Sequence, residues 1–306
     1  MSNHLKSIML NYIHEQKCKR RWGLFFKFFW LIVFFVFLFI CFTKYYRHNN
    51  VINKHHVALV TLDGIIGSNT YANSDQINKS LKAAFKNEKA KGVILRINST
   101  GGSPVESDNI YQQIRYLIDK YPEVQLYAVC TDVCTSGGYY VASAAKEIYA
   151  NKMTMTGSIG VRSDGFGFTE LIDKVGIERR LYIAGKDKGF LDPFQPQNSS
   201  QVADMENMLM KAHETFISAV KIGRGSRINS KYEDKIFSGA PFLGIQAKEY
   251  GLIDGFGSVE SILQDKFKNL PLLNYTQPLK FMEKINTNLS NELSCKVGQL
   301  SELRLQ

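Results

Sequence analysis

Apolar residues along the chain gather in one long run, which is followed by short runs separated by helical patterns. The long run covers residues 24–42. Strand-like runs follow at residues 58–62, 93–97, 126–129 and 148–150. They alternate with helical spacing in residues 76–85, 109–118 and 138–145. This alternation predicts an α/β fold with a mainly parallel sheet and crossover helices.

The long run has the length and composition of a membrane-spanning helix. It holds almost only Phe, Leu, Ile, Val and Trp, and Lys27 lies close enough to its start to reach the interface. A cleaved signal peptide is the competing interpretation, but the run ends Phe39-Ile40-Cys41-Phe42 without the small residues of a cleavage site. A buried core helix fits less well, because no polar face interrupts the run. We therefore expect an uncleaved signal anchor.

Basic residues on the two sides of the run predict its orientation. More of them precede the run than follow it: Lys6, Lys17, Lys19, Arg20 and Arg21 before it, and Lys44, Arg47 and Lys54 after it. The positive-inside rule then places the N-terminus in the cytoplasm and the rest of the chain outside. A basic tail beside anionic lipid also explains part of the net charge of +10. We see no motif of a nucleic-acid reader and expect no nucleic acid partner.

The residues after the anchor, about 250 of them, can form one sizeable domain. Residues 198–222 have the pattern of a long helix, which Gly223-Arg224-Gly225 ends. Residues 271–306 are rich in Asn, Ser and Lys with scattered Leu. That composition indicates a loosely ordered or partner-binding extension.

The segment Thr135-Ser136-Gly137-Gly138-Tyr139-Tyr140 carries the clearest chemistry in the chain. It follows an apolar strand and precedes small residues that suit a tightly packed helix. Such a turn exposes the Ser136 hydroxyl, and the N-terminus of the helix offers free N–H groups to an oxyanion. Taken alone, the segment also fits a glycine-rich connection with an incidental serine.

A nucleophilic serine needs a base, and the histidines of this chain are poorly placed for that role. Five of the 6 precede the predicted domain, and His213 lies on an amphipathic helix where a hydrogen-bonded or solvated histidine is the ordinary case. The composition therefore disfavours a Ser-His-Asp triad. A lysine whose pKa is lowered by burial is the remaining base.

The cysteines do not indicate a disulfide framework. Of the 5, Cys18 precedes the apolar run and Cys41 lies inside it. Cys130 and Cys134 flank the turn before Ser136 and fit small buried residues better than a metal pair, since no further ligands cluster with them. A bridge between them outside the cytoplasm stays open, as does Cys134 as an alternative nucleophile.

Several motifs of the chain resemble those of signal peptide peptidase A, the protease IV family of membrane-anchored Ser-Lys peptidases of bacteria. They occur in the same order as in that family. The first is Ser136-Gly137-Gly138-Tyr139-Tyr140, which is similar to the nucleophile motif of that family. The resemblance runs from about residue 57 to residue 263. The other matching segments are Ile97-Asn98-Ser99-Thr100-Gly101-Gly102-Ser103, Thr156-Gly157-Ser158-Ile159-Gly160-Val161, Ala184-Gly185-Lys186-Asp187-Lys188, Phe237-Ser238-Gly239, Gln246-Ala247 and Gly251-Leu252-Ile253-Asp254.

The resemblance implies roles for individual residues. Ser136 matches the nucleophile, Lys188 the general base and Ser158 the serine that orients the lysine, and Lys186 is the rival base. The backbone N–H groups of Gly102 and Gly137 would form the oxyanion hole. No cofactor or metal is implied.

Two positions depart from the family pattern. Thr100 stands where the family usually has proline, and Thr135 stands where it usually has alanine. The first change bears on the rigidity of the Gly101-Gly102 loop. Because the loss of one oxyanion donor typically costs about 100- to 1,000-fold in rate, a looser loop could lower turnover.

The resemblance also implies a fold and an organisation. The fold would be the Clp protease/crotonase-like superhelical α/β fold with an N-terminal transmembrane helix, assembled as a homo-oligomeric ring whose active sites are completed between neighbouring subunits. The segments expected are a basic cytoplasmic tail (1–23), the anchor (24–43), a linker (44–56), a Ser-Lys peptidase domain (57–270) and the unassigned extension (271–306).

The function expected from these observations is a serine endopeptidase of the bacterial inner membrane, with its catalytic domain on the periplasmic side. It would cleave apolar peptides, such as released signal peptides, and unfolded polypeptide, with membrane lipid as its other partner. The alternative is a membrane-anchored scaffold of the same fold that has lost turnover. An acyl-CoA enzyme shares the oxyanion hole but explains neither the anchor nor the Ser-Lys pairing.

Overall fold

The structure is a computed structural model that describes residues 22, 25–42 and 54–277. The chain divides into two units, residues 1–54 and 55–306. Most of the predicted cytoplasmic tail and linker, and residues 278–306 of the predicted extension, lie outside the described residues.

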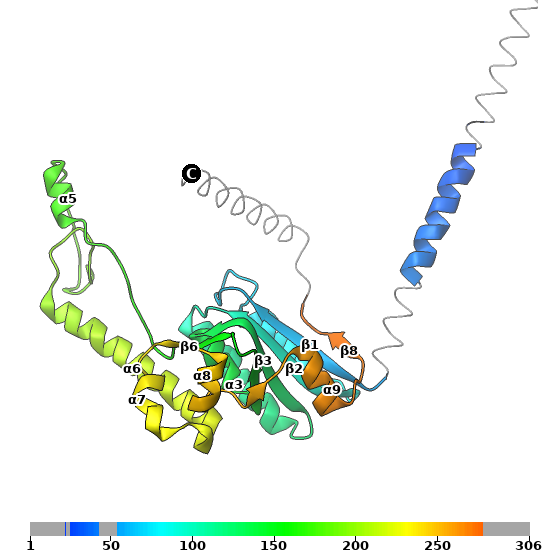
Figure 1. The fold of residues 1–306 in the computed structure, drawn as a ribbon. Helices are drawn as coiled ribbons and strands as arrows, with labels where there is room; N and C mark the ends of the chain where they lie inside the picture. The colour runs from blue at the N-terminus through cyan, green and yellow to red at the C-terminus, as the bar shows by residue number, and fades with distance from the viewer. Residues whose placement is uncertain (1–21, 23–24, 43–53, 278–306) are drawn as a thin grey trace, which may run out of the picture. The chain divides into compact units, whose positions relative to one another are not determined.

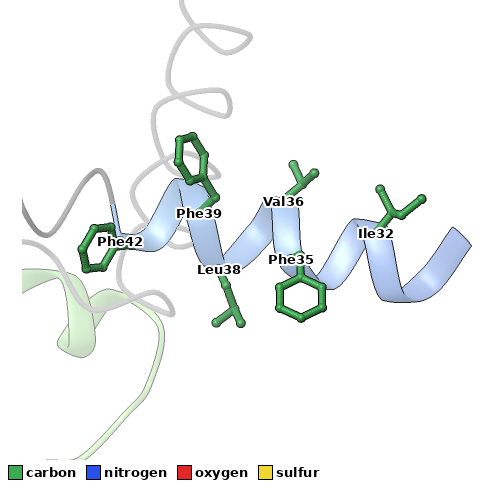
Figure 2. Close-up of a pocket in the computed structure, with 6 residues that line it drawn as sticks. All are labelled: Ile32, Phe35, Val36, Leu38, Phe39 and Phe42. Carbon is green, nitrogen blue, oxygen red and sulfur yellow. The ribbon is translucent and has the colours of Figure 1, made fainter. Parts of the chain in front are cut away.

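The first unit contains one described helix, Phe25–Phe42. It has 18 residues, a mean hydropathy of 2.7 and no buried position. Six of its side chains, drawn in Figure 2, project from several sides of the helix, so no polar face interrupts the apolar surface: Ile32, Phe35, Val36, Leu38, Phe39 and Phe42. By length and composition this helix can cross a membrane, although a signal sequence near an N-terminus shares both properties.

The second unit is built on an eight-stranded sheet (Figure 1). Its main order is β6-β5-β3-β2-β1-β8, and β4 joins the sheet between β3 and β7. Every pairing is parallel except that of β5 with β6. The strands are β1 (His56–Asp63), β2 (Ala90–Ser99), β3 (Gln125–Thr135), β4 (Glu147–Ala150), β5 (Met155–Gly157), β6 (Pro241–Leu243), β7 (Gly255–Phe256) and β8 (Leu272–Asn274). The predicted α/β class with a mainly parallel sheet is therefore confirmed.

Helices connect the parallel strands, and their ends follow from local sequence. Asn73 and Asn198 cap α2 and α6 by accepting hydrogen bonds from backbone N–H groups. Ser103 caps α3 and Pro104 begins it, which starts this helix five residues before the predicted position 109. The helices are α2 (Ser74–Lys86), α3 (Pro104–Lys120), α4 (Gly137–Ala142), α5 (Thr169–Lys174), α6 (Ser199–Arg224), α7 (Glu233–Ile236), α8 (Gly244–Tyr250) and α9 (Val259–Phe267), with short 3-10 turns at Gly225–Arg227 and Ser230–Tyr232.

Both faces of the sheet are covered, which explains why its central strands are apolar without interruption. Helices α2, α3 and α4 pack with one face around a large core that includes Val60, Leu95 and Ala128. Helix α9 covers the other face, where Ile94 and Val129 pack with its residues. Neighbouring residues of one strand thus enter opposite cores.

Residues 161–198 form an arm that carries α5. None of these residues is buried. Figure 1 shows α5 beyond the end of α6 that points away from the sheet. The arm is held together locally, because Arg179 binds Asp192 at 3.0 Å and the Phe168 ring stacks on Phe194. It is thus a self-contained projection with little core of its own.

The C-terminal end of the sheet lies beyond the predicted domain boundary at residue 270. Strand β8 pairs with β1, and the backbone N–H of Tyr275 donates to the Leu59 carbonyl at 2.8 Å. The Tyr275 hydroxyl also lies 2.8 Å from Nε2 of His56. The first residues assigned to the extension therefore belong to the folded sheet.

Candidate active site

Ser136 stands at the junction between β3 and α4. Its backbone has φ 51° and ψ −124°, a region that non-glycine residues rarely adopt and that typically costs about 1–3 kcal/mol. Its N–H donates to the Gly157 carbonyl and its carbonyl accepts from the N–H of Tyr140, both at 2.9 Å. These bonds hold the sharp turn that leaves Ser136 half-buried at the carboxyl end of the sheet.

The Gly101-Gly102 loop lies directly against this turn. A Cβ built on Gly101 would come within 2.6 Å of the Gly137 nitrogen and 2.8 Å of the Ser136 Cβ. A Cβ on Gly102 would meet the Ile66 carbonyl oxygen at 2.1 Å. Both glycines also have positive φ, 94° and 146°. Only glycine fits this approach of two backbones.

The backbone of this loop leaves one N–H directed away from its neighbour. On one edge of the loop, the N–H of Ile66 donates to the Gly101 carbonyl, and the Ile66 carbonyl accepts from the N–H of Ser103, each at 2.9 Å. Gly102 then presents its N–H on the opposite edge, and no described residue accepts from it. The N–H of Gly137, at the first position of α4, likewise has no acceptor in the described part of the chain.

These two N–H groups come from segments in direct contact beside Ser136. The Gly102 nitrogen is 3.4 Å from the position that a Gly137 Cβ would take. The arrangement offers two backbone donors and one hydroxyl at the same edge of the sheet. It can stabilise the oxyanion that forms when a hydroxyl attacks a carbonyl.

Ser99, the last residue of β2, supports the Gly101-Gly102 loop. Its Oγ accepts from the N–H of Gly101 at 3.1 Å, and the residue is 2% exposed. A Cβ on Gly138 would lie 2.9 Å from the Ser99 carbonyl oxygen, so α4 also rests on this residue. Ser99 is a support that the sequence analysis did not single out.

Ser158 occupies the corresponding position on the neighbouring strand. Thr135 of β3 pairs with Gly157 of β5, so Ser136 and Ser158 are the next residues after a cross-strand pair. Ser158 has φ 50°, and its N–H donates to the Ala240 carbonyl at 2.9 Å. The structure therefore brings together Ser136, Ser158, Gly102 and Gly137.

His213 is hydrogen-bonded beside this group. Its Nε2 lies 3.0 Å from the carbonyl oxygen of Ile159, the residue after Ser158. This contact agrees with the prediction that His213 is a hydrogen-bonded histidine on a helix. It also links α6 to the Ser158 turn, a contact that the amphipathic pattern could not show.

Lys188 and Lys186 lie apart from this group, on the arm. Both are exposed, and the Lys186 ammonium is 3.9 Å from the carboxylate of Asp187. The N–H of Lys188 donates to the Gly185 carbonyl at 3.0 Å. No contact joins either lysine to Ser136 within residues 54–277.

Cys130 and Cys134 form a disulfide within β3, one of the alternatives left open by the sequence. Both residues are buried, at 2% and 0% exposure. Among the described residues, no group of three His, Cys, Asp or Glu side chains could hold a metal ion.

Buried tyrosines make α4 a firm base for the turn. Burial raises the pKa of the Tyr139 hydroxyl, which donates to the Leu252 carbonyl at 2.7 Å. Burial and the hydrogen bond to Asp108 raise the pKa of Tyr140. Both hydroxyls stay protonated at neutral pH and serve as donors that fix the helix.

Comparison with known proteins identifies the family. Residues 119–271, half of the chain, match Peptidase family S49. This chain belongs to peptidase family S49. Membership confirms the resemblance to signal peptide peptidase A.

Two proteins similar to this chain match it over different shares of their own length. A protein of Enterococcus faecium, named provisionally as signal peptide peptidase SppA, is 29% identical over 232 residues, which is 73% of this chain and 66% of that protein. A Brucella abortus protein named Na(+)/H(+) antiporter NhaA is 39% identical over 198 residues, which is 65% of this chain. This chain spans 26% of the length of that protein.

A solved structure of 1510-N, a membrane-bound stomatin-specific protease in complex with a substrate peptide, has a TM-score of 0.49 and 16% identity to this S49 chain. The match covers 78% of this chain and 99% of that one. A likeness of this size carries no residue roles across.

Proposed function

We propose that this protein is a membrane-anchored serine endopeptidase that cleaves apolar peptides, such as released signal peptides, through an acyl-enzyme on Ser136. The observation that carries the proposal is the convergence of the strained Ser136 turn with the N–H groups of Gly102 and Gly137. Membership in a peptidase family supports the same chemistry.

In the proposed reaction, the Ser136 Oγ attacks the carbonyl carbon of the scissile peptide. The carbonyl oxygen gains negative charge and accepts from the N–H groups of Gly102 and Gly137. The Lys188 amine takes the serine proton and returns it to the leaving amine, and Ser158 orients the lysine. Water then hydrolyses the ester and regenerates Ser136.

Lys188 is proposed to act on Ser136 of a neighbouring copy of the chain. Lys188 is exposed on an arm without a buried residue. Large apolar side chains are exposed on the same arm, among them Phe166 at 81% and Tyr182 at 89%. Apolar surface of this kind marks a protein contact site. A ring of copies would cover it and deliver the lysine to the next subunit.

We place the catalytic domain on the extracytoplasmic side of the membrane. The apolar helix Phe25–Phe42 provides the anchor. A buried disulfide supports the location, because such bridges persist in oxidising compartments and are rare in the cytosol.

The test is hydrolysis of a fluorogenic apolar peptide by the full-length protein in detergent. We expect Ser136→Ala and Lys188→Ala each to lower kcat by at least about 10³-fold. Mixing the two inactive variants before assembly should restore activity, up to about a quarter of the wild-type value, because some junctions combine an intact serine with an intact lysine.

Lys186→Ala is the matched control, since it removes the neighbouring lysine and leaves Lys188 in place. It should retain activity. Activity retained in Lys188→Ala and lost in Lys186→Ala would move the base to Lys186. A folded wild-type protein that binds peptide without cleaving it would overturn the peptidase and favour the scaffold.

A further inference from the structure

The disulfide between Cys130 and Cys134 closes a bulge in the strand that carries Ser136. In a regular strand, residues four apart are separated by about 13 Å. Here their Cα atoms are 5.5 Å apart. The chain between them therefore bulges away from a straight path, although Val133 still pairs with Met155 of β5, and the bridge joins the two ends of the bulge.

The bulge changes the register of β3 against β2. Cys130 pairs with Ile97 and Cys134 pairs with Ser99, so a single β2 residue, Asn98, stands opposite three residues of β3. The second pairing matters for the site because the hydroxyl of Ser99 holds the N–H of Gly101. The end of β3 and the oxyanion loop are thus aligned through Cys134.

On its other side, β3 changes partner at the same place. Before the bulge, Cys130 pairs with Ala150 of β4. After the bulge, Cys134 pairs with Thr156 of β5, one residue before the pair that precedes Ser136 and Ser158. The bulge therefore lets one strand reach β5, from which Ser158 follows.

Polar contacts from neighbouring elements hold the residues of the bulge. The Thr131 hydroxyl donates to the Ile97 carbonyl at 3.3 Å, and the Thr131 backbone carbonyl accepts from the Thr154 hydroxyl. The N–H of Val133 donates to the Asn98 side chain at 3.3 Å. These bonds hold the bulge to β2 and to Thr154 independently of the covalent bridge.

We propose that the Cys130–Cys134 disulfide positions Ser136, so that peptide hydrolysis is fast only when this pair is oxidised. Only Thr135 separates Cys134 from Ser136, whose unusual backbone conformation requires firm surroundings. A misplacement of about 1 Å at a reacting centre can cost about 100-fold in rate. The inference rests on the proposed peptidase function.

The redox step needs an external dithiol. One thiolate attacks a cysteine sulfur, the Cys130–Cys134 bond breaks and a mixed disulfide forms, which the second thiol of the reagent resolves. The protein gains two hydrogens as thiols, and the reagent leaves as a cyclic disulfide. Both sulfurs are buried, so exchange proceeds through opening at the bulge, where Asp132 is exposed.

The experiment uses full-length protein in detergent with Cys18, Cys41 and Cys295 replaced by alanine, so that only the pair remains. Dithiothreitol is applied until mass spectrometry shows the gain of two hydrogens. We expect kcat for a fluorogenic apolar peptide to fall at least about 10-fold, with KM changed less than about twofold. Oxidised glutathione should restore kcat.

The double variant Cys130→Ala/Cys134→Ala is the matched control. Its kcat should be low with or without dithiothreitol, while circular dichroism and oligomeric state remain those of the oxidised protein. Unchanged kcat in the fully reduced protein would overturn the inference. So would loss of kcat accompanied by unfolding, since the bridge would then act on the whole domain.

Reaction of Ser136 with a fluorophosphonate separates this inference from the proposed function. If the oxidised protein hydrolyses no peptide, the proposed function fails. The labelling rate of Ser136 still tests the disulfide: a rate that falls on reduction and returns on oxidation supports the inference, and an unchanged rate overturns it.

Discussion

At the scale of single residues, the site depends on two glycines that leave no room for a side chain. Gly101 faces Ser136 and the Gly137 nitrogen at distances that a Cβ cannot accept. Its φ of 94° adds strain for any other residue. The close approach is therefore a property of residue size as much as of sequence motif.

We expect Gly101→Ala to lower kcat by at least about 100-fold, because the new methyl group separates the loop from Ser136 and displaces a donor of the oxyanion hole. Steady-state kinetics with a fluorogenic peptide measures the change. A variant with normal kcat would show that the loop and the serine need not touch.

Gly67→Ala is the control for that substitution. It lies near the same loop, but its added methyl would meet only Thr70, at an ordinary 3.4 Å. Its kcat should stay within about twofold of wild type.

The sequence predicts some residues of the site but not others. Ser136, Gly102, Gly137 and Ser158 were expected to act together, and the structure places them at one edge of the sheet. Ser99 was not expected, since a serine inside a motif does not show which atom it holds. The role of Lys188 stays a prediction, because the lysine is exposed on the arm and its proposed burial requires a neighbouring copy of the chain.

At the scale of elements, helix α6 approaches α4 at Gly223. A Cβ there would lie 1.9 Å from the Ser143 carbonyl oxygen, next to the end of α4. The helix that carries His213 thus contacts the helix that begins after Ser136. This contact lies at the C-terminal end of α6, opposite the end that the arm joins, and connects α6 with the base of the site.

We expect Gly223→Ala to destabilise the domain by roughly 1–3 kcal/mol, measured by chemical denaturation. Helix propensity alone favours alanine over glycine by about 0.5–1 kcal/mol, but a backbone carbonyl cannot move aside without shifting one helix. Ser218→Ala, at an exposed position of α6, should change stability by less than about 0.5 kcal/mol. If Gly223→Ala were as stable as the wild-type protein, or more stable, that result would contradict the close contact.

The elements themselves were predictable where apolar patterns are long. Apolar runs predict the strands β1 to β4, and helical periodicity predicts the helices at residues 76–85, 109–118 and 198–222. Strands β5, β6, β7 and β8 have two or three residues each, too few for a period of two to be visible. The bulge between Cys130 and Cys134 also escapes such patterns, because it interrupts the alternation of side chains.

At the scale of the whole molecule, a buried ion pair fastens the end of α6 to the sheet. Arg224 has a fully buried side chain and binds Asp254 at 2.6 Å. Asp254 also accepts from the N–H of Ile148 at 2.7 Å, the second residue of β4. Burial alone would raise the pKa of Asp254, but Arg224, Ile148 and Arg227 together hold it below its usual value.

This lowered pKa predicts an acid-dependent loss of stability. The contribution of the Asp254 carboxylate is present above the unfolded pKa of about 3.9 and disappears as the pH falls through the lower folded pKa. Asp254→Asn should cost about 3–5 kcal/mol at pH 7, since Arg224 is left as an uncompensated buried charge. Denaturation at several pH values should show this difference shrinking below about pH 4.

Asp265→Asn, at an exposed position on α9, is the control and should leave the free energy of unfolding almost unchanged. A pH-independent difference between wild type and Asp254→Asn would contradict the assignment to carboxylate protonation.

The contact between His56 and Tyr275 has a topological consequence. His56 begins β1 and Tyr275 follows β8, and their rings stack with centroids 5.8 Å apart. The chain therefore enters and leaves the sheet at neighbouring positions, as in domains that tolerate circular permutation. A short linker could join the chain after Tyr275 to the chain before His56. New termini could then be opened in the exposed turn at residues 88–89, and the order of the strands within the sheet would stay the same.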